Sequence, residues 1–376
     1  MKSRLQIFAE ASNNSGARLV NRIMTKISIG LGACYCLLLL SAGAHGQVVH
    51  DLPKLINSSD VVAVARVAAV AQTGSGTVEI PGGQSISAHF RVANLHLTAV
   101  LKGTLVSADI PVRYAILYSP AGWGGGIPSG YTIQDTLTPN STGLVFLKSV
   151  GDRYEFTNGS YLSVVCSPEG PGNAEPPDAF NRVLSLITGA LFSANVPQQE
   201  KAKAIRQLGA VETDSVIPAL RTFVQGDLAR EDQFLRTEAL VALLWHKDES
   251  VVDAAESELL GGSSPYWKSN LLFAITRAVG PSRSIAVLAQ VLAGSSAPMR
   301  TSAAVAIYQT NSAAGIPPLL SALDDADPQV AFAVMQGLGN LTQNYAWRPK
   351  STELDANWFR CLNHWREYRQ HWNYGK

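Results

Sequence analysis

The sequence predicts an exported protein in which a mostly-β domain, a sandwich or a barrel, is followed by an all-α solenoid. Three observations support this fold class. An apolar segment lies near the N-terminus, short β-branched segments fill the first half of the chain, and helical segments recur at a fixed spacing in the second half. The chain has 376 residues, 46% of them hydrophobic and 16% charged, which fits about two globular domains.

Residues 1–46 are the predicted export signal. Lys26 precedes the apolar run ISIGLGACYCLLLL, which ends in small residues before Gln47. A basic start, an apolar core and small residues at the exit are typical of a secretory signal peptide, and Met24 is then the expected translation start. We therefore expect a periplasmic or secreted protein with no stable membrane span after cleavage. The alternative is a retained membrane anchor.

The charge balance argues against a nucleic-acid partner. The first 46 residues carry five Lys/Arg and one Asp/Glu, which leaves 25 basic against 28 acidic side chains in the remainder, a net charge of −3. Nucleic-acid-binding domains usually carry a basic patch or stripe. We therefore expect a protein partner and no nucleic acid.

Residues 47–165 are the predicted β domain. Their segments alternate apolar and polar residues or are β-branched, and the separators are rich in Gly, Pro, Ser and Asn, a pattern typical of strands. The expected strands cover residues 60–70, 90–103, 109–118, 142–150, 152–159 and 161–165. Gly151 and Asp152 are expected to form a hairpin turn. The stretches SDVVAVARV and VLKG weakly resemble netrin-like or OB barrels, and we transfer no function from this resemblance.

Residues 166–178, CSPEGPGNAEPPD, are the predicted linker, because Pro and Gly at this density favour an extended connection. A helix is expected to restart after it, with Asp178 as its N-cap. One face of that helix is apolar and is formed by Phe180, Val183, Leu184, Ile187 and Leu191.

Residues 179–343 contain an internal repeat. Similar nine-residue segments follow one another at intervals of 35, 32, 32 and 31 residues, and each has small or apolar residues at its fourth, fifth and eighth positions, on one helical face. These segments begin at Lys201, Arg236, Lys268, Arg300 and Ala331. A second set interleaves with them at Ile217, Val251, Ile285 and Ile316. Helix pairs at such a period bury a core only by stacking on their neighbours.

The helix pairs resemble HEAT repeats, and the resemblance covers roughly residues 198–343. It rests on an Ile/Pro-Leu first helix, on the Asp-Pro turn DDADPQV at residues 324–330, and on the basic residue that opens the second helix in three repeats. Ala331 replaces this basic residue in the last repeat. The resemblance implies an α-solenoid; the alternative is an unrelated helical bundle with accidental periodicity.

Residues 344–376 are aromatic and are predicted to form a helix that caps the last repeat. Leu354, Trp358, Leu362, Trp365 and Trp372 recur at spacings close to one helix face. A terminal repeat needs such a cover, since it otherwise exposes one side of its core. The alternative is an exposed aromatic strip that docks a partner.

No motif for catalysis or for a cofactor is present. The sequence lacks a phosphate-binding loop, a nucleophile elbow and an H-E-x-x-H motif. Cys361, His364 and His371 have the spacing of no common zinc site. We predict no catalytic, cofactor or metal site. Pairing of Cys166 with Cys361 in an oxidising compartment stays open.

The leading functional prediction is an exported, non-catalytic interaction or scaffold protein that uses the repeat surface. The alternative is an envelope enzyme or enzyme inhibitor whose site is built from loops of the β domain. In HEAT-like arrays the second helices line the concave side, which implies that a partner contacts them. The candidate binding residues are Arg236, Glu238, Trp245, Lys268, Asn270, Arg300, Ser302 and Tyr308.

Glu238, Asn270 and Ser302 hold equivalent repeat positions and are expected to face outward. The basic residues that open the second helices, Arg236, Lys268 and Arg300, have a second interpretation. The HEAT resemblance implies that they only form hydrogen bonds to the neighbouring turn.

Overall fold

The computed structural model describes residues 51–80, 84–104, 107–117, 131–132, 137–162, 178–261 and 268–374. The predicted export signal, Cys166 and most of the predicted linker lie outside these ranges. Among the helices that are described, none is both long and apolar enough to cross a membrane.

The N-terminal half is a β-barrel, as one of the two predicted alternatives requires. Strand β1 pairs with β2 and β5, β2 pairs with β3, and β6 joins β5 to β3, so the sheet closes on itself. All these pairings are antiparallel except that of β3 with β6. A five-stranded closed sheet of this kind fits the predicted resemblance to OB barrels. The strands are β1 (Val61–Ile80), β2 (Gln84–Lys102), β3 (Asp109–Leu117), β5 (Thr142–Val150) and β6 (Arg153–Leu162), with a short β4 (Tyr131–Thr132) beside β3.

Both faces of β1 are buried at its start, which explains its nearly continuous apolar sequence. Successive side chains of a strand point to opposite faces. Val61, Ala63 and Ala65 belong to the barrel interior, whereas Val62 and Val64 belong to a second core that includes the helices. The outer face of β1 and β5 is thus covered by helices α2 (Leu52–Ser58) and α3 (Ala179–Phe192).

Helix α2 is fixed at its C-terminal end by one lysine. The Nζ of Lys102 donates to the carbonyls of Ile56 at 2.7 Å, Asn57 at 3.3 Å and Ser59 at 2.6 Å. The last carbonyls of a helix have no partner within it, and a cation there also opposes the negative end of the helix dipole. Lys102 therefore ties the end of β2 to α2.

The hairpin between β5 and β6 turns at the predicted place. Val150 pairs with Arg153, and Gly151 has a φ of 64°, a conformation that glycine adopts without steric cost. The prediction for Gly151 and Asp152 is confirmed.

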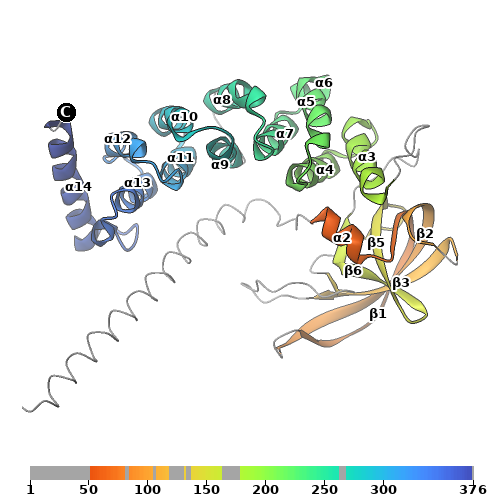
Figure 1. Ribbon diagram of the computed structural model, residues 1–376. Coiled ribbons are helices and arrows are strands. Elements are labelled where there is room, and N and C mark those ends of the chain that lie inside the picture. Colours follow the sequence, from red (N-terminus) through yellow and green to blue (C-terminus); the bar gives the residue numbers. More distant parts are fainter. Residues whose placement is uncertain are drawn as a thin grey trace, which may run out of the picture. The chain divides into compact units, whose positions relative to one another are not determined.

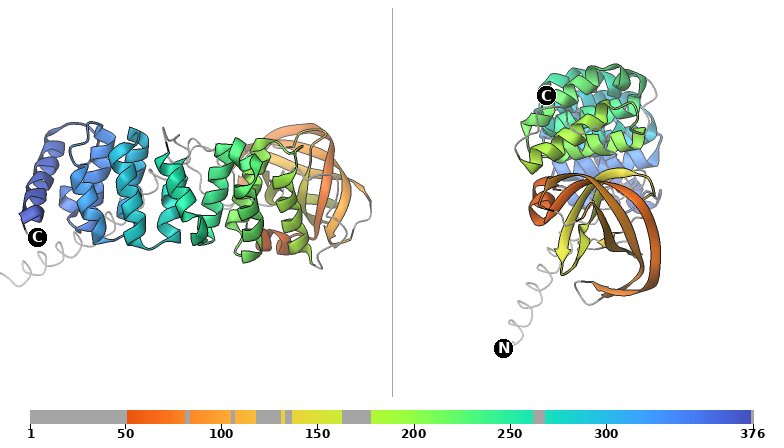
Figure 2. Two further views of the ribbon diagram at one scale, coloured as in Figure 1. Left: turned by 90° about the horizontal axis from the view of Figure 1, so that it is seen from above. Right: turned by 90° about the vertical axis from the view of Figure 1, so that its right-hand side faces the viewer.

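The C-terminal half consists of two layers of helices that alternate along the chain (Figure 1). The first layer contains α3, α5 (Ile217–Gln225) with the short α6 (Asp227–Glu231), α8 (Val252–Leu260), α10 (Pro281–Gly294) and α12 (Ile316–Ser321). The second layer contains α4 (Gln198–Ala210), α7 (Gln233–Trp245), α9 (Ser269–Ala278), α11 (Ala297–Gln309) and α13 (Pro328–Leu341). Each helix of the second layer packs on the next one, side by side (Figure 2).

Three first-layer helices begin in the same way. A polar residue accepts a hydrogen bond from the backbone N–H two residues later, and a single 3-10 turn leads into the α-helix. The accepting residues are Thr213, Asp248 and Ser312. Such side chains satisfy N–H groups that the helix leaves free. The repeat therefore extends to the local structure of its turns.

The first helix of the solenoid also begins as predicted. Asp178 caps α3 by accepting from the backbone N–H of Asn181 at 2.9 Å. Of the predicted apolar face, four residues are buried and Phe180 is partly buried.

Helix α14 (Ala356–Tyr374) covers the last repeat. Trp358, Leu362 and Trp365 are buried in the same core as the repeats, and the indole N–H of Trp365 donates to the carbonyl of Trp347 at 2.8 Å. Leu354, which we predicted on the apolar face, instead precedes the helix and is 57% exposed, because the chain between α13 and α14 holds no helix at that point. Cys361 is a buried free thiol, and burial raises its pKa.

Candidate functional site

The second-layer helices approach one another closely where glycine replaces a side chain. A Cβ built on Gly209 of α4 would lie 2.8 Å from the Cβ of Ala242 of α7. A Cβ on Gly337 of α13 would lie 3.3 Å from the Cβ of Tyr308 of α11. At Gly209 the close approach of Ala242 leaves no room for a side chain, whereas at Gly337 the side chains of Tyr308 and Leu319 would have to shift to admit one.

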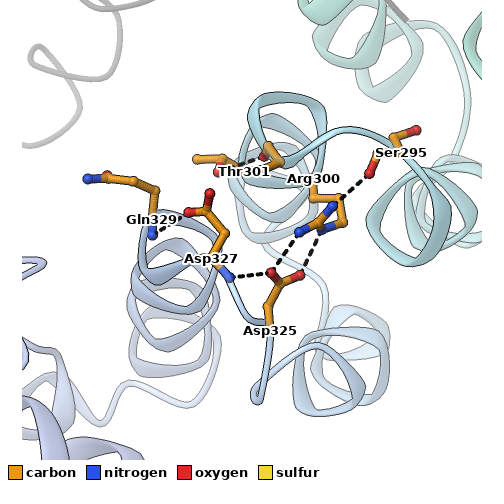
Figure 3. Close-up of polar contacts among 7 residues, drawn as sticks. Ser295, Arg300, Thr301, Asp325, Asp327 and Gln329 are labelled. Atoms are coloured by element: carbon orange, nitrogen blue, oxygen red, sulfur yellow. Dashed lines mark hydrogen bonds and ion pairs between the residues drawn. The ribbon is translucent and has the colours of Figure 1, made fainter. Parts of the chain in front are cut away.

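Arg300 is committed to holding two repeats together (Figure 3). Its Nε donates to one carboxylate oxygen of Asp325 at 2.7 Å, a second guanidinium nitrogen donates to the other oxygen at 2.8 Å, and a third donates to the carbonyl of Ser295. These hydrogen bonds raise the pKa of Arg300 and lower that of Asp325. A bidentate pair of this kind is among the stronger polar interactions in proteins.

Lys268 is also engaged within the chain. It is completely buried, and its Nζ lies 2.9 Å from both the carboxylate and the backbone carbonyl of Glu258 in the preceding helix. A buried ammonium needs such partners to remain charged. The geometry of Lys268 and Arg300 therefore favours the interpretation in which the basic residues bond their neighbours.

The prediction that Glu238 and Ser302 face outward is wrong. Glu238 is 7% exposed and accepts two hydrogen bonds from Arg206 of α4, at 2.7 and 3.0 Å. Ser302 is 6% exposed, and its hydroxyl donates to the carbonyl of Pro298 one turn earlier. Neighbouring helices cover both positions. Asn270, at the equivalent position of α9, is exposed as predicted.

Trp245 is also exposed to solvent. It is 52% exposed at the C-terminal end of α7, and the guanidinium carbon of Arg277, in α9, lies 4.4 Å from the centroid of its ring. A cation over an indole face is attracted by the ring quadrupole. Within the described part of the chain, Arg277 forms no ion pair with an acidic side chain.

Three half-buried apolar residues extend the surface around Trp245. Phe234 and Val241 share its side of α7, since they precede it by eleven and four residues, and Phe273 precedes Arg277 by one helical turn in α9. We call these five residues the α7–α9 face: Phe234, Val241, Trp245, Phe273 and Arg277. Arg206 borders this face, with its guanidinium 5.9 Å from the ring of Phe234.

The remaining two candidates, Arg236 in α7 and Tyr308 in α11, are not part of this face. Arg236 is partly buried, and its Nε has no hydrogen-bond partner among the described residues. Tyr308 is partly buried and packs against the helical core near Gly337.

Sequence reasoning missed Arg277, Phe273, Val241 and Phe234. A signal for the first of these was available, because Arg277 follows Trp245 by 32 residues, the same interval that separates the repeats. The prediction took Trp245 and Tyr308 from the last turns of α7 and α11 but passed over the position in α9 that is equivalent to Trp245.

The described residues contain no group of three His, Cys, Asp or Glu side chains close enough together to hold a metal ion.

Part of the chain matches a known family. Residues 299–325 match the family described as PBS lyase HEAT-like repeat. The match covers α11 from Met299 onward and all of α12, and it ends at Asp325, the partner of Arg300. No characterised protein matches the chain at a significant level.

Proposed function

We propose that this protein is an exported, non-catalytic scaffold that binds a protein partner on the α7–α9 face. The HEAT-like repeat region in the C-terminal half supports this proposal. The single observation that carries this proposal is the exposed Trp245 with Arg277 stacked upon it, as part of a partly apolar surface. Trp and Arg are the residues most enriched in binding hot spots.

The chemistry of the face indicates the kind of partner it suits. Trp245, Val241 and Phe273 offer apolar contact, and Arg277 offers a cation that no acidic side chain of the described chain neutralises. A matching segment would place an aliphatic or aromatic side chain on the indole and a carboxylate on the guanidinium. An acidic segment with neighbouring apolar residues has this character.

The repeat residues support this use by their rigidity. Arg206 and Lys268 are each held by an acidic residue of another helix, and Arg300 is held by Asp325 in the turn between α12 and α13; all three ion pairs are at least partly buried. A surface fixed in this way loses little conformational entropy when a partner binds. The same residues are therefore expected to affect stability more than affinity.

The proposal that the protein is exported is tested separately from partner binding, because it rests on the apolar N-terminal segment. N-terminal mass spectrometry of the protein from its producing cell should find a chain that begins near Gln47. A chain that still carries the CLLLL run would indicate an anchor and direct the partner search to the membrane.

Partner binding is tested by quantitative capture with purified variants. Trp245→Ala and Arg277→Glu should each reduce capture of the partner by at least about thirtyfold, as expected of hot-spot residues worth 2 kcal/mol or more. Phe359→Ala is the matched control, since Phe359 is 50% exposed on α14. Full capture by both variants, with unchanged melting temperatures, would reject this face and return attention to the alternative, an enzyme or inhibitor site on the barrel loops.

A further inference from the structure

Among the described residues, no strand lies beside one edge of β1 over most of its length. β5 pairs with β1 from Val61 to Arg66, and the last contacts are backbone hydrogen bonds between Val67 and residues 140 and 141. The chain turns away there, because Asn140 adopts a φ of 69°. In the described part of the chain, no strand pairs with this edge of β1 beyond Val67.

The unpaired edge lacks the charged residues and prolines that often protect an edge strand. Residues 67–78, VAAVAQTGSGTV, contain neither a charged residue nor a proline. Ala69, Ala71 and Thr73 are exposed. Natural proteins discourage edge-to-edge pairing with Lys, inward charges, Pro or bulges, since open N–H and C=O groups are a template for another strand.

Bulges are the one such feature present, and they leave much of the edge regular. The register of β1 against β2 shifts between Val67 and Ala69 and again between Gln72 and Gly74. From Gly74 to Ile80 the pairing continues without a shift. β2 supports the strand from the other side throughout, so the edge is held in an extended conformation.

We propose that this edge is a self-association site, at which residues 69–78 of β1 pair antiparallel with the same residues of a second copy of the chain. Antiparallel pairing of a strand with its own copy has two-fold symmetry, so the assembly closes as a dimer. Like charges directly opposite one another destabilise such a pairing. A segment with no charged residue avoids this repulsion, whereas it offers nothing to select a charged peptide of another protein.

The expected dimer is weak. Pairing through one strand edge and small side chains buries less surface than a stable interface usually requires. The dimer should therefore dissociate on dilution.

Sedimentation velocity of the purified protein over a wide range of concentration tests the proposal. The wild-type chain should shift from monomer to dimer as its concentration rises. The triple variant Ala69→Glu, Ala71→Glu, Thr73→Glu should stay monomeric, because it places repeated carboxylates along the paired edge. Asn94→Glu is the matched control: Asn94 is exposed and lies opposite Ala69 on β2, with β3 on its other side. It should dimerise like the wild type.

Circular dichroism and thermal melting establish that each variant is folded. A wild-type protein that is monomeric at every concentration would overturn the proposal, as would a dimer that a folded triple variant leaves unchanged. A triple variant that fails to fold is replaced by Thr73→Glu alone, which should weaken the dimer relative to Asn94→Glu.

Discussion

Single residues with a left-handed backbone end three of the second-layer helices. Lys247, Asn311 and Gln343 have φ values of 57°, 54° and 58°, and they follow α7, α11 and α13. Glycine is the usual residue at this position, because a side chain there is crowded by the following carbonyl. The repeat thus preserves a backbone conformation without preserving the residue that suits it best.

Gln343→Gly should stabilise the protein by about 0.5 to 1 kcal/mol, since it removes this crowding. Asn311→Gly should have a smaller effect, because Asn tolerates the left-handed region. Urea unfolding of the two variants beside the wild type measures the difference. An equal or larger gain from Asn311→Gly would show that backbone crowding is not the cause.

Lys268 provides a second test at this scale. Lys268→Met should lower the free energy of unfolding by about 3 to 5 kcal/mol, because it leaves the carboxylate of Glu258 without its cation in a buried position. Lys203→Met is the control, since Lys203 forms an i,i+3 pair with Glu200 nearer the surface, where such pairs contribute about 0 to 1 kcal/mol. Equal losses in the two variants would contradict a special role for the buried pair.

At the scale of the structural elements, the turn that begins η2 (Glu249–Val251) links two repeats through an ion pair. The carboxylate of Asp248 accepts hydrogen bonds from Arg221 of α5 at 2.7 Å and caps the N–H of Ser250. These interactions, the hydrogen bond from Arg221 foremost, lower the pKa of Asp248 to about 2. A depressed carboxylate pKa stabilises the fold above the pKa of the unfolded chain, and this stabilisation is lost as the pH falls towards 2.

Asp248→Asn should therefore cost about 2 kcal/mol at pH 7, because the amide retains the cap but loses the charge that pairs with Arg221. The difference between variant and wild type should shrink as the pH falls from about 4 towards 2. Denaturant unfolding at a series of pH values measures it. Asp253→Asn, at an exposed ion pair with Arg283, is the control and should show little change at any pH. A pH-independent difference for Asp248→Asn would rule out the charge as its source.

The sequence was sufficient to predict the elements with a strong period and missed those without one. The second helices were found because apolar residues recur at fixed positions near Arg236, Lys268 and Arg300. The first strand was predicted to end at residue 70, but β1 continues to Ile80 through AQTGSG. Those small polar residues resemble a loop in composition, and only their pairing with β2 makes them a strand.

The sequence predicted only part of the candidate site, because only some of its residues follow the repeat pattern. The repeat identified the correct layer of helices and included Trp245. Glu238 was misplaced because its burial depends on Arg206, which reaches across from α4, the preceding helix of the second layer, and whose aligned position in the other repeats holds no basic residue. Contacts between repeats decide which side chains are free, and a pattern within one repeat does not contain them.

Among the described residues, the helices and the outer face of the barrel share one continuous core. It contains Phe146 of β5, Ile187 of α3 and Trp365 of α14. In repeat proteins each unit depends on its neighbours, so damage at one end lowers the stability of the next unit. The barrel is therefore expected to support the first repeats.

Phe146→Ala should destabilise the protein by about 3 to 5 kcal/mol and lower the melting temperature of the helices as well as that of the barrel. Phe156→Ala, inside the barrel, is the comparison. Circular dichroism of the helical signal during thermal unfolding distinguishes the two cores. A helical transition that Phe146→Ala leaves unchanged would show that the barrel and the helices unfold independently.

The most direct test of the central claim, that the α7–α9 face binds a protein partner while the buried ion pairs hold the array, is hydroxyl-radical footprinting of the protein with and without its captured partner. We expect Trp245 and Phe273 to lose reactivity in the complex, and the exposed Phe359 of α14 to keep it. Unchanged reactivity of Trp245, together with protection of the barrel or of α14, would contradict the claim.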